Sequence, residues 1–425
     1  MAEVFKLLNK VKHYPWGSVS LIPQFLGREE NTEPWAEIWM GAYPGFSSQA
    51  ELAGGECGLD ELIVKNPIHY LGEKAARKYG ILPFLFKVLA PDKPMSIQAH
   101  PSMAQAKEGF ARENAAALPL YAHNRNYKDA NHKPEILCAI AHNGRNLPFI
   151  GLCGFRNPQE IHSLLSAFLE TDAAAPYYGN LQKNFITLLQ ALKIPDPSSA
   201  LKAFFIALFN LSPQEREILT TNALSLNTLC AISKKNSSLL SSDGDEIQLI
   251  QNFAALYPGD PAVISPLYLN VFRLEQGEAI FLEAGILHAY CCGFGIELMA
   301  NSDNILRGGL TNKYIDVPEL INILDFNPYI PKIIKPDTHS ACFKYPFQSD
   351  EFSLRVMHGV SSAEKAESTA YPCKGTSVCI VTHGEVSIGN IILRQGESAF
   401  IPPPASKDGP LLLKGNYTLY IASTP

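Results

Sequence analysis

The hydrophobic pattern of this chain changes its period twice, and this limits the folds that the chain can adopt. Residues 157–258 carry apolar residues at helical spacing. Before this block, in residues 1–100, and after about residue 262, short apolar runs alternate with Gly and Pro turns, as is typical of strands. A helical block of about 100 residues is therefore predicted to be inserted into a mainly β protein. In its first segment, NPQEIHSLLSAFLE, the apolar stripe consists of Ile161, Leu164, Leu165, Phe168 and Leu169.

Two helices inside the block begin with capping signals. Asn157 and Ser212 are favourable N-cap residues, and each is followed by Pro at the first helical position. Glu160 and Glu215 stand three residues later, which is the spacing of a capping box. We interpret the apolar stripes as core, because the block contains no group of residues typical of a catalytic site. A separate helix is predicted over residues 102–118.

Two segments outside the block are alike. GEAIFLEAGILH runs from Gly277 to His288, and GESAFIPPPASK runs from Gly396 to Lys407. Each has Gly-Glu, an apolar strand, a turn, and a polar residue eleven positions after the Gly. This pattern resembles the second motif of the cupin superfamily, in which a His that closes the turn binds a metal ion. The second copy ends in Lys, so its jelly roll is predicted to hold no metal.

A chain of 425 residues is too long for one hydrophobic core, and three domains are predicted. A Pro-rich stretch near 326–337 is interpreted as a linker. The expected parts are a cupin-type jelly-roll catalytic domain of residues 1–155 plus 260–326, an inserted all-α domain of residues 156–259, and a C-terminal jelly-roll domain of residues 327–425 without metal ligands.

Composition excludes several classes of protein. The formal net charge is −6 and no long Lys/Arg cluster occurs, so a nucleic-acid partner is not expected. No apolar run reaches the length of a membrane span, and the N-terminus lacks the apolar core of a signal peptide. Nine cysteines without CxxC spacing, including the adjacent Cys291 and Cys292, indicate reduced thiols. We therefore expect a cytoplasmic, monomeric protein that acts on a small molecule.

The stretch MSIQAHP follows LPFLFKVLA, an apolar run that predicts a buried strand. Gln98 and His100 are two residues apart, so on a strand they point to the same side. His288 closes the cupin-like turn, and Glu135 begins another apolar run. Two imidazoles, a carboxylate and an amide oxygen suit a divalent ion of the zinc type. From the residues alone, each could equally be a buried polar group with a hydrogen-bond partner.

Longer motifs reduce this ambiguity. MSIQAHP, YKDANHKPE and GIELMANSDNILRGGLTNKYIDVPEL, together with HYPWG and WAEIWMGAYP, resemble the signature segments of type I mannose-6-phosphate isomerases. The resemblance implies the reversible conversion of mannose 6-phosphate to fructose 6-phosphate through a cis-enediol, in mannose metabolism and GDP-mannose biosynthesis. It also implies one zinc ion per chain, with the ligands Gln98, His100, Glu135 and His288.

The resemblance also implies catalytic roles. His132 and Lys133 are expected in ring opening and proton transfer, and Glu297 and Asp303 are further candidates for the base. Lys133 can act as a base only if burial and the metal lower its pKa, whereas Glu297 needs little shift to be ionised. The identity of the base stays open at this point. Arg307 is expected close to the reacting carbons, where it would stabilise the enediolate.

The substrate phosphate needs cations. The resemblance assigns this role to Arg307, Lys313, Lys87 and Ser96, and it places Trp16, Glu37 and Tyr290 around the pocket. Without the resemblance, a lysine inside an apolar strand could simply extend to the rim. Two departures from the family pattern, Tyr43 in place of His and Gly308 in place of Ala, remove no ligand.

Two other functions are compatible with the residues. A cupin Fe(II) oxygenase would use His and Glu ligands, but it has no need of the basic residues or of a Gln ligand. A sugar-phosphate sensor would bind the substrate without turning it over, and the intact catalytic candidates argue against it.

Overall fold

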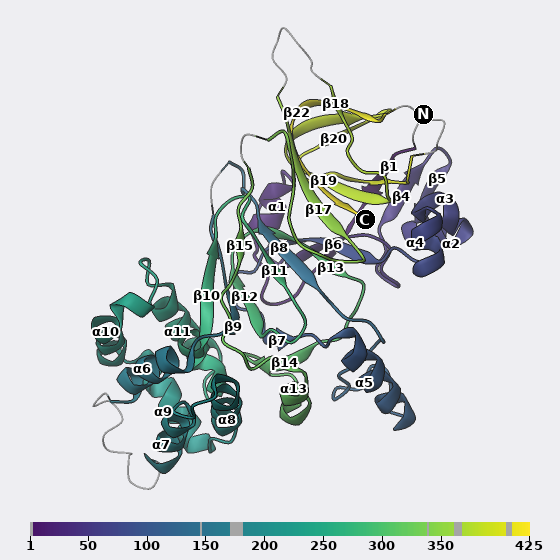
Figure 1. The fold of residues 1–425 in the computed structure, drawn as a ribbon. Coiled ribbons are helices and arrows are strands. Elements are labelled where there is room, and N and C mark those ends of the chain that lie inside the picture. The colour runs from purple at the N-terminus through teal and green to yellow at the C-terminus, as the bar shows by residue number, and fades with distance from the viewer. Residues whose placement is uncertain (1–2, 145–146, 171–181, 338–339, 361–367, 405–409) are drawn as a thin grey trace.

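The computed structural model describes residues 3–144, 147–170, 182–337, 340–360, 368–404 and 410–425. In Figure 1 the helical block lies at one end of a central β region, and the C-terminal strands lie at the other end. The chain is mainly β with a helical insert, as predicted. Lys407, the last residue of the second cupin-like copy, lies outside the described residues.

Two antiparallel sheets form the central region. Buried side chains from both, among them Leu137 and Phe149, pack into one apolar cluster between the sheets. The seven-stranded sheet has the order β15 (Ile333–Ile334), β11 (Ala279–Leu282), β8 (Glu135–Ala139), β13 (Gly295–Ala300), β6 (Phe84–Leu89), β3 (Glu37–Met40) and β2 (Lys10–Lys12). The five-stranded sheet has the order β10 (Leu269–Leu274), β9 (Phe149–Phe155), β12 (His288–Cys292), β7 (Ile97–Ala99) and β14 (Leu306–Gly309).

The insert is helical throughout its described part, and the five residues of the predicted apolar stripe are buried. Ser212 and Glu215 form the expected capping box. Asn157 caps its helix by accepting a hydrogen bond from the backbone N–H of Gln159, and Glu160 takes no part in it. The helices are α6 (Pro158–Leu169), α7 (Gln182–Ala191), α8 (Pro197–Phe209), α9 (Pro213–Leu224), α10 (Leu226–Lys235) and α11 (Asp245–Leu256), with the 3-10 helix η2 (Ser237–Leu239).

The C-terminal strands belong to a ten-stranded sheet that also contains N-terminal strands. Its main path is β16 (Cys342–Lys344), β17 (Ser353–Gly359), β22 (Leu412–Ser423), β19 (Ser377–Ile388), β21 (Ser398–Ile401), β1 (Phe5–Leu8), β4 (Gln49–Leu52) and β5 (Gly55–Gly58). Off this path, β18 (Thr369–Ala370) pairs with β22, and β20 (Ile391–Arg394) pairs with β19. The first strand of the chain is therefore hydrogen-bonded to the C-terminal jelly roll, at a register that pairs Phe5 with Phe400.

Short helices complete the described chain. The helix predicted over 102–118 is α5 (Met103–Ala115), with a capping box from Ser102 and Gln105. The remaining helices are α1 (Leu21–Phe25), α2 (Leu59–Lys65), α3 (Pro67–Leu71), α4 (Glu73–Lys78), η3 (Pro261–Ile264), α12 (Ser265–Tyr268) and α13 (Val317–Ile323). None of the helices in the described ranges is long and apolar enough to cross a lipid bilayer.

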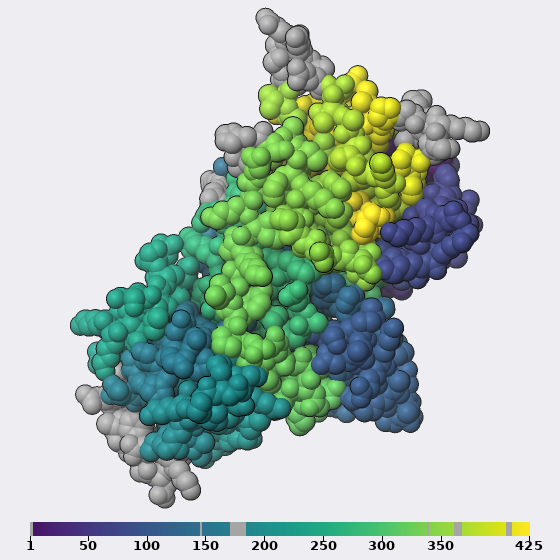
Figure 2. Space-filling model, in the orientation of Figure 1, coloured from purple at the N-terminus to yellow at the C-terminus, as the bar shows by residue number. Residues whose placement is uncertain are grey.

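Contacts between the N-terminal and C-terminal parts of the chain cross the predicted domain boundaries. The N-terminal helices lie directly against C-terminal residues (Figure 2), and Lys78 Nζ is 2.8 Å from Asp350 Oδ2. The Pro-rich stretch interpreted as a linker also contributes β15 to the edge of the seven-stranded sheet. The domain boundaries stay a prediction, with β1, β4 and β5 joined to the C-terminal sheet rather than to the catalytic sheets.

Candidate active site and metal centre

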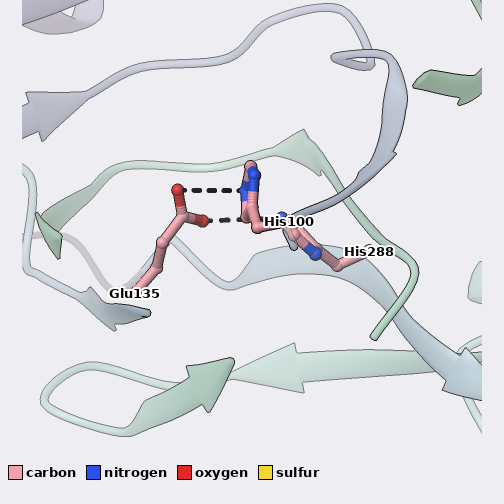
Figure 3. A group of neighbouring side chains, drawn as sticks. All are labelled: His100, Glu135 and His288. Carbon is pink, nitrogen blue, oxygen red and sulfur yellow. Dashed lines mark ion pairs between the residues drawn. The ribbon is translucent and has the colours of Figure 1, made fainter. Parts of the chain in front are cut away.

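The predicted metal ligands come together between the two central sheets. Gln98 on β7 is the direct register partner of His288, the first residue of β12. His100 follows β7 immediately, and Glu135 is the first residue of β8 in the opposite sheet. Figure 3 shows the Glu135 carboxylate directed at both imidazoles. All four side chains are buried, so strand pairing and the facing of two sheets bring together residues from four separate places in the sequence.

The distances define a compact donor set. His100 Nε2 lies 3.3 Å from Glu135 Oε1, and His288 Nε2 lies 3.5 Å from Glu135 Oε2. The ligand atoms of these three residues all lie within 4.8 Å of one another. The Gln98 carboxamide is next to them, with Nε2 3.5 Å from His288 Nε2, and a half-turn of the amide exchanges its nitrogen for its oxygen.

Backbone carbonyls orient both imidazoles. His100 Nδ1 lies 2.8 Å from the carbonyl oxygen of Asn304, and His288 Nδ1 lies 2.9 Å from that of Ile286. A carbonyl oxygen only accepts, so each Nδ1 carries a proton, and in the neutral form of each ring Nε2 is the nitrogen that presents a lone pair to the cluster. This arrangement, in which the second ring nitrogen donates to a carbonyl, is usual for metal-binding histidines.

Unpartnered atoms and charge both fit a cation at this place. His100 Nε2 is buried and has no hydrogen-bond partner, and Glu135 Oε1 is buried with no hydrogen bond besides its 2.8 Å ion pair with Lys133 Nζ. Burial, and then the charge of Lys133, lowers the pKa of His100 to about 4, so the imidazole is neutral near pH 7. Burial alone would raise the pKa of Glu135, but Lys133 and His100 hold it well below its usual value. Neutral imidazoles and an ionised carboxylate are the ligand states that zinc requires.

Lys133 and His132 face different surroundings. Lys133 Nζ lies 2.8 Å from Glu135 Oε1, at the edge of the donor set. His132 Nε2 instead lies 2.9 Å from Glu351 Oε1, which belongs to the segment before β17. Both His132 and Glu351 line a cleft of about 790 Å³ between the central region and the C-terminal residues. The structure therefore brings Lys133, but not His132, together with the predicted metal ligands.

Lys87 forms a buried charge cluster beside this site. Its Nζ donates to Glu297 Oε2 at 2.9 Å and lies 3.8 Å from Glu37 Oε1. Glu37 also accepts from Trp39 Nε1 at 2.6 Å. Burial opposes the charge on Lys87, yet the two carboxylates raise its pKa overall. Lys87 is only 6% exposed, so it does not extend to the rim, and within this structure its partners are carboxylates.

The state of Glu297 follows from the same cluster. Burial raises the pKa of Glu297, the charge of Lys87 opposes this shift, and the charge of Glu135 adds to it. Tyr290 is also buried here, with its hydroxyl 3.5 Å from Glu135 Oε2. Burial, and then the charges of Glu297 and Glu135, raises the pKa of Tyr290 well above its usual value, so its hydroxyl stays protonated.

A group of cations lies beyond the metal cluster. Arg307 on β14 is the register partner of Gln98. Neither the Arg307 guanidinium nor the Lys313 ammonium has a hydrogen bond or ion pair with any described residue. Burial, then the charges of Arg307 and Lys128, lowers the pKa of Lys313. Asp303 Oδ2 lies 3.3 Å from Lys128 Nζ, and Lys128 and Lys133 together outweigh burial and lower the pKa of Asp303. Three cations thus share one carboxylate, which leaves an excess of positive charge.

The remaining predicted pocket residues lie near the strand ends. Trp16 stacks on Tyr14 with ring centroids 5.6 Å apart and packs on the apolar cluster that contains Tyr290. Ser96 is half-buried directly before β7. Tyr43, one of the departures from the family pattern, lies beside Asp303, and burial followed by that charge raises its pKa.

Three residues that organise this site were not among the predicted site residues. Lys128, Asp129 and Asn304 all lie inside the quoted motifs YKDANHKPE and GIELMANSDNILRGG, but nothing in their spacing showed that the two motifs touch. Lys128 contributes to the cation group, and Asn304 binds Asp129 through its side chain.

Comparison with known proteins identifies the family. Residues 4–158 match the family model for the catalytic domain of type I phosphomannose isomerase. A mannose-6-phosphate isomerase from Escherichia coli K12 is 36% identical, and the match covers 97% of each chain. A mannose-6-phosphate isomerase from Macaca fascicularis is 31% identical over 99% of this chain and 96% of the relative.

Solved structures agree with this result. A mutant phosphomannose isomerase from Salmonella typhimurium superposes with a TM-score of 0.82 at 33% identity, and a zinc-bound mannose 6-phosphate isomerase does so with a TM-score of 0.81 at 34% identity. Each comparison covers 100% of both chains. This protein therefore belongs to the type I phosphomannose isomerase family.

Proposed function

We propose that this protein interconverts mannose 6-phosphate and fructose 6-phosphate with one zinc ion bound per chain. The observation that carries the proposal is the buried cluster of His100, Glu135 and His288, in which His100 Nε2 has no hydrogen-bond partner, in a chain that belongs to this isomerase family. Gln98 completes the proposed ligand set through its amide oxygen. When bound, the ion supplies a Lewis acid that polarises a substrate oxygen.

The reaction moves a proton between C2 and C1 of the open-chain sugar, and we assign the base to Glu297. Burial raises its pKa, which makes it a stronger base than an ordinary carboxylate. Lys133 is the rival, but it would have to leave its contact with Glu135 to accept a proton. Because His132 is paired with Glu351, we assign ring opening to Lys133 alone.

We assign the substrate phosphate to the cation group of Arg307, Lys313 and Lys128. Neither of the first two makes a direct ion pair with a described residue, and Asp303 is the one carboxylate whose charge acts on both, so a phosphate supplies the missing negative charge. Lys87 is compensated by two carboxylates, so its proposed role is to hold Glu297 in place and to moderate its pKa. Ser96 and Trp16 are proposed to border the sugar, and Asp303 to orient Lys128.

Tyr290 and Glu37 complete the proposal. The Tyr290 hydroxyl, next to Glu135 Oε2, is a neutral donor that can hold a sugar oxygen near the metal ligands. Glu37 binds Lys87 and Trp39 and thereby fixes the wall of the pocket. We also propose that the protein works as a monomer in the cytoplasm, which its mass in solution and cell fractionation can test.

The test of function is a coupled assay for fructose 6-phosphate formed from mannose 6-phosphate by the purified, zinc-loaded protein. Turnover at a rate typical of enzymes supports the isomerase. Binding of the sugar phosphate without turnover would identify a sensor instead. Oxygen uptake by the iron-loaded protein, with no isomerisation, would identify an oxygenase.

A further inference from the structure

Asn304 is fully buried at the junction of three functional segments. Its side-chain oxygen accepts from the backbone N–H of Lys128 at 2.7 Å and from that of Asp129 at 3.2 Å. Its side-chain Nδ2 donates to the carbonyl oxygens of Asp129 at 2.8 Å and Asn131 at 2.9 Å, and to Asp129 Oδ1 at 3.2 Å. One carboxamide therefore uses both its oxygen and its nitrogen to hold the segment that leads into Lys133 and Glu135.

The backbone of Asn304 serves a different residue. Its carbonyl oxygen accepts the hydrogen bond from His100 Nδ1 at 2.8 Å, and this bond fixes the ring so that Nε2 faces Glu135. The carbonyl cannot move independently of the side chain, because the side chain is held at several points. The orientation of His100 and the position of the segment before Glu135 are thus set by one residue.

Asp129 reinforces the same junction from the other side. Its Oδ2 accepts from the backbone N–H of Asp303 at 2.8 Å, and its Oδ1 accepts from the Ser302 hydroxyl at 2.9 Å. Lys128, whose backbone N–H binds the Asn304 side chain, also forms an ion pair with Asp303, the residue before Asn304. Lys128 Nζ lies 3.3 Å from Asp303 Oδ2. The two loops are consequently cross-linked by main-chain and side-chain bonds that only polar residues of this shape can make.

We infer that Asn304 is a positioning residue for the metal centre: its side chain locks residues 128–131 against its own backbone, so that His100 Nε2 and Glu135 stay in register for one cation. This inference rests on the proposed zinc site, but it concerns how firmly the site holds zinc rather than whether the sugar is isomerised. Residues that support metal ligands in this way typically change metal affinity by about 10–100-fold when they are replaced.

The experiment compares Asn304→Ala and Asn304→Asp with the control Asn301→Ala. Asn301 lies three residues earlier, and its side chain makes one long hydrogen bond, 3.4 Å, to the carbonyl of Leu82. For each full-length protein, the affinity for zinc and the rate of zinc release to a chelator are measured, together with the thermal midpoint of the zinc-free form. Asn304→Asp keeps the shape of the side chain and the oxygen that accepts from Lys128 and Asp129. It replaces the donating Nδ2 by an oxygen, which cannot donate to the carbonyl oxygens of Asp129 and Asn131.

The expected result is a zinc affinity about tenfold or more lower in both Asn304 variants than in the control, measured at a temperature below the zinc-free midpoint of every variant so that each protein is folded. A zinc affinity and release rate equal to those of the control would overturn the inference, whatever the isomerase activity. If Asn304→Ala does not fold, Asn304→Asp and the separate variant Asp129→Asn give the same reading, because each breaks the junction with a near-isosteric side chain. An inactive parent that still binds zinc would refute the proposed function and leave this comparison decisive.

Discussion

Replacing Lys87 by methionine is the most informative test of the charge cluster beside the metal centre. The side chain keeps similar length and apolar area, but the 2.9 Å bond to Glu297 and the 3.8 Å contact with Glu37 lose their cation. Removing one partner of a buried ion pair leaves an uncompensated charge and typically costs about 3–5 kcal/mol. All three side chains are under a tenth exposed, so solvent screening reduces this cost little.

The pH dependence provides a second signature. The pKa of Glu297 is already raised in the folded protein, and loss of Lys87 raises it further. A carboxyl with a raised folded-state pKa favours folding when protonated, and this contribution is lost as the pH rises from its unfolded to its folded pKa. Lys87→Met is therefore expected to be more destabilising at about pH 8 than at about pH 5.

The assay is thermal unfolding of the zinc-free protein at both pH values. A loss of about 3–5 kcal/mol corresponds to roughly 6–20 °C for a domain of about 150–250 residues. Lys107→Met, an exposed lysine on α5, is the control and should shift the midpoint by far less. The double variant Lys87→Met with Glu297→Gln should recover part of the loss. Equal stability of Lys87→Met and the parent at both pH values would refute the assignment of Lys87 as the charge partner of Glu297.

Four other substitutions separate the proposed roles. His288→Ala should lose zinc and activity together, because it removes a metal ligand; retained zinc with full activity would sink the ligand assignment. Glu297→Gln should keep zinc but lower kcat by about 10²–10⁴-fold, as expected for loss of a general base, and an unchanged kcat would transfer that role to Lys133. Arg307→Ala should lose turnover while zinc is retained, and a parental rate in this variant would remove Arg307 from substrate binding. Lys128→Ala should mainly raise KM, by about tenfold for the loss of one charged hydrogen bond. A parental KM in this variant would remove Lys128 from substrate binding.

Much of this architecture could be predicted from local sequence. The apolar stripe of 157–169 gave the helix and its buried face, because helical period and burial are properties of adjacent residues. The alternation that put Gln98 and His100 on one side of a strand likewise holds in the structure, where both join the donor set. The cupin-like turn and the start of another apolar run added His288 and Glu135 as candidates, and the family resemblance implied that all four are ligands. The structure places the four side chains together.

Other features depend on contacts between residues far apart in the chain, and no local pattern encodes them. The pairing of Phe5 with Phe400 joins the first strand to the C-terminal sheet. His132 is adjacent to Lys133 in sequence, yet it pairs with Glu351, 219 residues away. No local pattern distinguished Asn304 from other polar residues of its motif, because its contact with Asp129 joins two distant segments. The family resemblance implied that Lys87 binds phosphate, and the sequence could not reveal that two carboxylates already surround this lysine.

The proposed isomerisation depends on one zinc ion held by the buried His–Glu–His cluster. The most direct test titrates zinc into protein stripped by chelation and records bound zinc and the isomerase rate on the same samples. We expect the rate to rise in proportion to bound zinc and to reach its plateau at about one ion per chain. Full activity in the zinc-free protein, or bound zinc that leaves the rate unchanged, would contradict it.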